Sequence, residues 1–155
     1  IYTGENWNPG LNAPLRGPGI GVKEGDYILE VNGVTVSSSE NIYQYFEATA
    51  NRQTKLRVNS KPSLEGSRLV TVVPTDNENQ LRMMNWIESN RRKVNELSKG
   101  QLAYVYVPNT AQPGYTSFNR YYFPQQDRKG AIIDERNNGG GSAADYMVDV
   151  MSRQL

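Results

Sequence analysis

The segment that most constrains this chain lies near its end, where a short apolar run at residues 131–133 leads through charged residues into Gly139, Gly140 and Gly141. The apolar run is typical of a buried strand. Glycine adopts backbone conformations that other residues avoid and lets other atoms approach the main chain closely. Three glycines after a strand therefore predict a sharp turn that leaves backbone amides open.

The surrounding residues alternate between strand and helix patterns. Residues 102–107 and 131–134 read as strands, whereas residues 115–123 and 143–151 read as amphipathic helices. A β-α-β-α order favours a parallel sheet with a right-handed crossover. Two strands cannot bury both faces of such a sheet, so we expect the segment to be part of a larger α/β domain.

The first half of the chain shows shorter strands. Asn32-Gly33 favours a tight hairpin turn and is flanked by apolar positions, which predicts two strands within residues 26–36. Two more strands are predicted around residues 56–58 and 69–72. Between the pairs, Ser and Glu residues predict the start of a helix that runs to Ala50. Its predicted apolar face consists of Ile42, Tyr45, Phe46 and Thr49.

A long helix is predicted after residue 74. Thr75 and Glu78 have the spacing of a capping box, and apolar residues then recur every three or four positions. Gly100 can leave a helix through positive φ, so it marks the expected end. The fold class indicated by the sequence is α+β, with a small β-rich domain, a long connecting helix and a partial α/β segment.

Composition excludes several kinds of site. The 155 residues contain no cysteine and no histidine, which removes disulfides, thiolate metal sites and a Ser-His-Asp triad within the chain. A net charge of +1 gives no global attraction to nucleic acid or an anionic membrane. We expect no metal, no cofactor and no membrane span, while the compartment, cytoplasmic or periplasmic, stays open.

Residues 25–33, Gly-Asp-Tyr-Ile-Leu-Glu-Val-Asn-Gly, preceded by Ala13-Pro14-Leu15 and Gly19-Ile20, resemble a PDZ domain of bacterial and archaeal proteases. The resemblance implies a groove between a strand and the helix at 39–50, where an extended peptide or unfolded polypeptide adds a strand. Its candidate wall residues are Ile42, Tyr45 and Phe46. Each could instead be core packing, because an apolar helix stripe usually faces the core.

Residues 85–100, 104–108 and 134–141 are similar to the tricorn proteases, relatives of the tail-specific serine proteases. The resemblance implies three parts: a PDZ domain at 1–74, a connecting helix at 75–99, and a truncated start of the serine protease domain at 100–155. It also implies that Gly141, with Gly140, gives backbone amides to an oxyanion hole. The nucleophile and base would lie outside these residues, so the chain alone is expected to be inactive.

Other interpretations remain beside this one. The chain could be a non-catalytic PDZ interaction module that binds peptides. Residues 139–144 also fit a dinucleotide-binding pattern, but the charged insertion after the strand disfavours it. Ser142 is expected to cap a helix rather than act as a nucleophile. Asp134 and Glu135 are adjacent on a strand, so they should point to opposite faces instead of converging on one atom.

Overall fold

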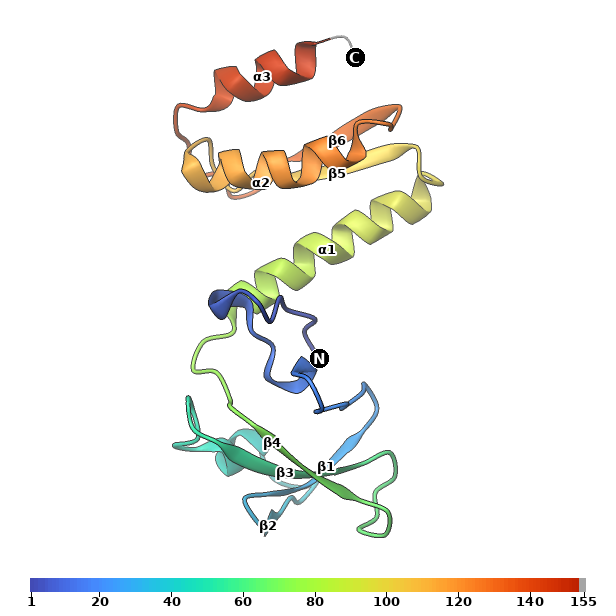
Figure 1. Ribbon diagram of the computed structural model, residues 1–155, viewed down its shortest axis with the longest axis vertical. Helices are drawn as coiled ribbons and strands as arrows, with labels where there is room; N and C mark the ends of the chain where they lie inside the picture. The colour runs from blue at the N-terminus through green and yellow to red at the C-terminus, as the bar shows by residue number, and fades with distance from the viewer. Residues whose placement is uncertain (154–155) are drawn as a thin grey trace. The chain divides into compact units, whose positions relative to one another are not determined.

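An antiparallel sheet and a parallel sheet organise residues 1–153, the part of the chain that this computed structural model describes (Figure 1). The chain divides into two compact units, Ile1–Asn85 and Trp86–Leu155, and the division falls within the long helix α1 (Asn79–Leu97). The mixed fold class that we expected from the sequence is confirmed. The assignment of residues 1–74, 75–99 and 100–155 to named domains stays a prediction.

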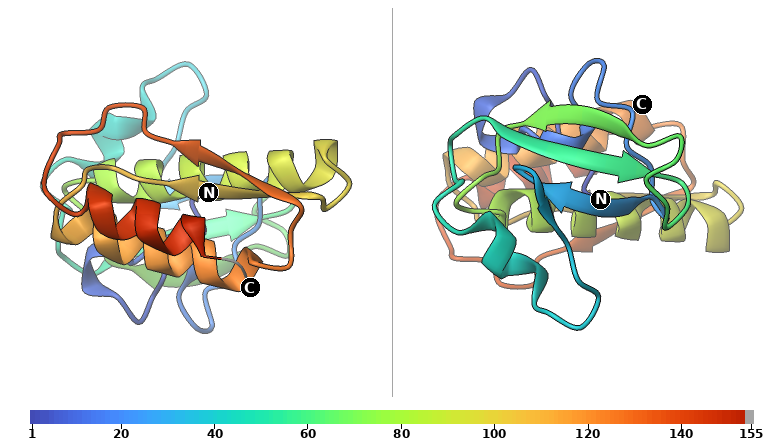
Figure 2. Two further views of the ribbon diagram at one scale, coloured as in Figure 1. Left: turned by 90° about the horizontal axis from the view of Figure 1, so that it is seen from above. Right: turned by 90° about the horizontal axis from the view of Figure 1, so that it is seen from below.

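The first unit contains a four-stranded antiparallel sheet of order β2-β1-β3-β4. Its strands are β1 (Tyr27–Val31), β2 (Val34–Thr35), β3 (Thr54–Asn59) and β4 (Arg68–Val72), which appear in the right-hand view of Figure 2. Asn32 and Gly33 take φ values of 49° and 84° between β1 and β2, as a two-residue hairpin turn requires. The predicted hairpin and the two later strands are therefore confirmed.

One face of this sheet is buried. Along β3, Thr54, Leu56 and Val58 point inward and are at most 1% exposed, whereas the residues between them are more exposed. This alternation is the period of a half-buried strand. The fully buried core of the unit consists of Val22, Val31, Leu56, Val58, Val70 and Val72.

The helix expected to run to Ala50 is shorter than predicted. Only a 3₁₀ turn, η3 (Ile42–Phe46), forms, and the side chain of Asn41 accepts from the amide of Tyr43 at its start. The chain then turns at Ala48, where φ is 55°, and both the amide and the hydroxyl of Thr49 donate to the carbonyl of Phe46. This local turn replaces the helical bonds, so the prediction of a longer helix was wrong.

The capping box predicted from Thr75 and Glu78 also does not form. Asn77 provides the side-chain oxygen that accepts from the amide of Asn79, while the Thr75 hydroxyl donates to the carbonyl of Asn77. Glu78 instead pairs with Arg82 one turn later. The predicted end is confirmed, because Gly100 has φ 75° and donates to the carbonyl of Asn95.

The second unit contains two parallel strands, β5 (Leu102–Tyr106) and β6 (Gly130–Asp134), in register from Leu102 opposite Gly130. Helices α2 (Gln112–Tyr122) and α3 (Ala144–Ser152) and the short η4 (Phe123–Gln125) complete it, and Figure 2 shows α2 and α3 in its left-hand view. The predicted β-α-β-α order and parallel pairing are confirmed. Its buried core is Ile87, Tyr104, Val105, Tyr106, Val107, Phe118, Tyr121, Met147 and Val150.

The two outer edges of the parallel sheet differ. The Gln125 side chain accepts from the Tyr104 amide at 3.3 Å and donates to the Tyr104 carbonyl at 3.1 Å, so it occupies the outer edge of β5. The Ser117 hydroxyl also donates to the Tyr106 carbonyl at 2.6 Å. Within residues 1–153 no strand pairs with the outer edge of β6, where Ile132 is 41% exposed.

No helix within residues 1–153, α1 included, combines the length and the hydrophobicity that a bilayer span requires.

Candidate peptide pocket and glycine loop

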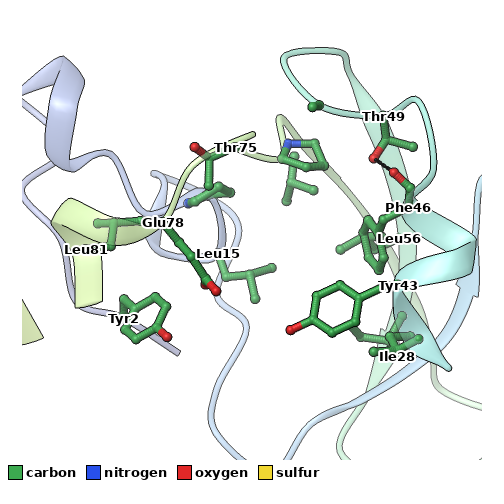
Figure 3. A pocket seen from close by; sticks show the side chains of 15 residues that line it. Tyr2, Leu15, Ile28, Tyr43, Phe46, Thr49, Leu56, Thr75, Glu78 and Leu81 are labelled. Carbon is green, nitrogen blue, oxygen red and sulfur yellow. Dashed lines mark hydrogen bonds between the residues drawn. The ribbon is translucent and has the colours of Figure 1, made fainter. Parts of the chain in front are cut away.

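The first unit contains an apolar pocket of about 560 Å³ (Figure 3). This volume lies within the range of about 300–1,000 Å³ that is usual for ligand sites. Side chains of the sheet, of η3 and of the start of α1 form part of its wall, and the N-terminal segment and the segments that flank η3 and α1 contribute the rest. The lining residues are Tyr2, Pro14, Leu15, Ile28, Ile42, Tyr43, Phe46, Thr49, Ala50, Leu56, Val72, Pro74, Thr75, Glu78 and Leu81.

Two of the three predicted peptide-binding residues line this pocket. Ile42 and Phe46 belong to its wall, whereas Tyr45 does not; its hydroxyl accepts from the Ser37 amide at 3.0 Å and donates to Glu40. Tyr43 lines the pocket instead and is 71% exposed. The three predicted residues were chosen on an α-helical period, whereas a 3₁₀ turn has three residues per turn.

Spacing alone would not have identified Tyr43. Tyr43 and Phe46 are three residues apart in η3 and both line the pocket, but Ile42 and Tyr45 have the same spacing and only Ile42 lines it. Nothing in the apolar pattern alone distinguishes this period from the α-helical one over five residues. The asparagine at position 41, which caps so short a turn, is the one local signal.

The pocket contains little charge. Glu78 is the only lining side chain with a formal charge, and its carboxylate accepts from the Arg82 Nε at 2.9 Å. In Figure 3 the Glu78 side chain extends toward the space between Tyr2 and Tyr43. The Thr49 and Thr75 hydroxyls already donate to backbone carbonyls at 2.7 Å and 2.9 Å. The interior is thus suited to apolar groups, and the hydroxyls of Tyr2 and Tyr43 are its phenol groups.

The glycine loop of the second unit leaves one predicted amide free. The Gly139 amide donates to the Pro108 carbonyl at 3.1 Å, and the Gly140 amide donates to the Asn138 side chain at 2.7 Å. The Gly141 amide has no acceptor among residues 1–153, and the residue is exposed. Of the two amides predicted for an oxyanion hole, only that of Gly141 is unoccupied in the described part of the chain.

Close packing accounts for the glycine at position 141. Its φ is 143°, and a Cβ atom there would lie 2.3 Å from the backbone carbon and oxygen of Thr110. Two hydrogen bonds hold the loop to Thr110. The Thr110 amide donates to the Gly140 carbonyl at 2.9 Å, and the Ala143 amide donates to the Thr110 carbonyl at 2.6 Å. Gly140 has φ 80° but open space where a Cβ would lie. The two glycines therefore meet different requirements.

A buried polar network lies where β6 meets this loop. Asp134 is 7% exposed and accepts from the Tyr104 hydroxyl at 2.6 Å and from the Arg136 Nε at 2.9 Å. The Arg136 guanidinium also lies over the ring of Trp86, 4.7 Å from its centroid. Asn90 donates to the Tyr104 hydroxyl at 3.2 Å. These contacts fix the direction in which the chain leaves the sheet.

The network shifts the ionisation of its members. Hydrogen bonds from Arg136 hold the pKa of Asp134 well below its usual value, and this outweighs the opposing effect of burial. Burial, with the hydrogen bond to the Asp134 carboxylate, raises the pKa of Tyr104 to about 12. Asp134 is therefore a structural anion with its partners already in place. Glu135, expected on the same strand, lies outside β6, which ends at Asp134.

Ser142 does not cap α3. The residue at the cap position is Ala143, which has no side-chain oxygen, and no side-chain bond caps the helix. The prediction for Ser142 was wrong because α3 begins one residue later than a cap at Ser142 would allow. Among residues 1–153 there is no group of three or more His, Cys, Asp or Glu residues that could hold a metal ion.

The chain is similar in sequence to known proteins. A family model described as the tricorn protease PDZ domain matches residues 1–77. The tricorn protease of Thermoplasma acidophilum is 29% identical over 99% of the chain, and the tricorn protease homolog 1 of Streptomyces coelicolor is 31% identical over all of it. The chain spans 14% of the length of each.

A solved structure gives the same result. The crystal structure of the tricorn protease matches 99% of the chain with a TM-score of 0.82 and 27% identity, and the match covers 15% of that protein. The sequence match and the structural match thus extend beyond the PDZ domain into the second unit. The resemblance to the tricorn proteases is confirmed: residues 1–77 match their PDZ domain, and the chain is similar to one short stretch of these enzymes.

Proposed function

We propose that this chain serves a tricorn-like serine endopeptidase, in which the first unit binds peptide or unfolded polypeptide for hydrolysis. The observation that carries the proposal is the apolar pocket, because it lies within the residues that match a PDZ domain and includes Ile42 and Phe46. β4 is an edge strand of the sheet, and its residue Val72 lines the pocket. An extended peptide could pair with such an edge and place side chains in the pocket.

The second unit would contribute to the reaction itself. In this proposal the free Gly141 amide donates to the tetrahedral oxyanion that forms during attack on the peptide bond. The Gly140 amide would have to release the Asn138 side chain before it could join. The serine and the base would come from outside these residues, and the serine would form the acyl-enzyme.

Peptide binding can be tested on the 155-residue chain by fluorescence anisotropy with labelled apolar peptides. Tyr43 lines the pocket and is 71% exposed, so Tyr43→Ala removes a contact without opening the core. We expect about tenfold weaker binding, since an aromatic side chain buried on binding contributes about 1–2 kcal/mol.

Tyr27→Ala is the matched control, because Tyr27 is 47% exposed, belongs to the same unit and does not line the pocket. Equal losses in the two variants would refute the pocket as the binding site. In a separate assay the purified chain should not hydrolyse peptides. Turnover that a serine-directed inhibitor abolishes would contradict the proposal that the nucleophile lies outside these residues.

A further inference from the structure

The pocket of the first unit also indicates which part of a polypeptide it accepts. We propose that it receives apolar side chains from an internal or blocked segment rather than a chain end bearing a free carboxylate. This inference rests on the proposed peptide-binding function and specifies its ligand. It is argued from the charges and hydrogen-bond donors of the lining residues.

A carboxylate that leaves water needs cations or free donors to replace its hydration. No lysine or arginine is among the lining residues, and the chain has no histidine. The only formal charge in the lining is the carboxylate of Glu78, which is paired with Arg82 and offers a second carboxylate no attraction. The charge distribution of the pocket thus opposes a terminal carboxylate.

The cation that pairs with Glu78 is already occupied. Arg82 lies one turn after Glu78 on α1, and both its Nε and its Nη2 donate to the same Glu78 oxygen. The two threonine hydroxyls of the lining donate to backbone carbonyls. The phenol hydroxyls of Tyr2 and Tyr43 remain, and each can also donate to the neutral carbonyl of a peptide bond.

The apolar wall of the pocket supports the second part of the proposal, which is that the pocket receives apolar side chains. Ile42, Phe46 and Leu81 line the pocket from η3 and α1, and buried strand residues form more of its wall. A leucine or phenylalanine side chain that enters this space exchanges water for hydrocarbon contact, which is favourable without any charge. The occupant is therefore a short apolar segment of extended polypeptide.

Three versions of one labelled peptide test this with the full chain. The first ends in Leu-Phe with a free carboxylate, the second ends in Leu-Phe amide, and the third continues past Leu-Phe with Gly-Ser-Gly-Ser. Anisotropy titrations should show that the amide and the extended peptide bind alike and about tenfold tighter than the acid. An acid that binds as tightly as the amide, or tighter, would overturn the inference.

Two variants locate the source of the discrimination. Glu78→Gln should narrow the difference between acid and amide, because it removes the carboxylate from the lining and releases its partner Arg82. Glu65→Gln is the control, since Glu65 is exposed in the same unit and does not line the pocket. If the difference in affinity between the acid and the amide is the same in Glu78→Gln as in the native chain, the argument from Glu78 is overturned. If no version of the peptide binds, the proposed function fails first, whereas binding that favours the acid refutes only this inference.

Discussion

Asparagine in place of Asp134 would keep the shape of this side chain but remove its charge. In the native chain Asp134 accepts from the Tyr104 hydroxyl and from both the backbone and the guanidinium of Arg136. A buried hydrogen bond to a charged group contributes about 1.5–3 kcal/mol. Because the Arg136 side chain is 63% exposed, water can replace part of the lost ion pair. We expect Asp134→Asn to lower the free energy of unfolding of the second unit by about 2 kcal/mol.

The pH dependence follows from the lowered pKa of Asp134. The unfolded chain takes up a proton at the usual carboxyl pKa, near 3.8, while the folded chain resists protonation. The stability that the charge provides is therefore fully present above this value and is lost as the pH falls through the lower pKa of the folded state. The difference between the native chain and Asp134→Asn should be constant from about pH 5 to pH 7 and shrink below about pH 4.

Urea unfolding followed by tryptophan fluorescence measures this difference. Trp7 and Trp86 are the two tryptophans, and Trp7 is 83% exposed, so a Trp7→Phe background leaves a signal that comes from the second unit. Asp149→Asn is the matched control. Its partner is Arg153, and both side chains are more than 60% exposed, which predicts a loss below about 0.5 kcal/mol.

Two results would refute the reasoning. If Asp134→Asn costs no more than Asp149→Asn at pH 7, the buried network does not stabilise the unit as described. If the difference stays the same at acid pH, the charge of Asp134 is not its source, and the loss reflects packing.

Two further predictions concern the same unit. Gly140→Ala should lower the free energy of unfolding in urea by about 1 kcal/mol, because φ is positive at this position but a Cβ atom would have open space. Gly141→Ala should lower it by at least about 2 kcal/mol, since its Cβ would meet the Thr110 backbone. Equal losses in the two variants would contradict the packing argument. An ultraviolet titration should show one tyrosine ionisation near pH 12, and this step should be missing in Tyr104→Phe. Because this pKa is raised, the stability that Tyr104 provides is present below its usual pKa of about 10 and should be lost as the pH rises toward 12.

Local chemistry explains which elements could be predicted from the sequence. The hairpin at Asn32-Gly33 and the end of α1 at Gly100 follow from residues that suit positive φ, and both are as expected. The shortened helix at η3 could not be predicted in this way. It depends on Ala48 taking a positive φ, an unfavourable conformation that Thr49 stabilises through the carbonyl of Phe46.

The candidate sites depend on contacts between distant parts of the chain. The glycine run indicated a turn with open amides, but the Asn138 side chain occupies the Gly140 amide, and only the close approach of Thr110 explains why position 141 must be glycine. Likewise, the sequence indicated only that Asp134 and Glu135 point to opposite faces of a strand. That the neighbours of Asp134 are Tyr104 and an arginine stacked on Trp86 follows from tertiary packing, which periodicity does not encode.

The Gln125 side chain on β5 makes growth of the parallel sheet one-directional. By bonding both the amide and the carbonyl of Tyr104, it takes the place that a neighbouring strand would need on that side. A strand that joins this sheet must therefore add to β6, directly beside the segment that leads into the glycine loop. The open edge of the sheet thus belongs to the strand whose carboxyl end leads into the glycine loop.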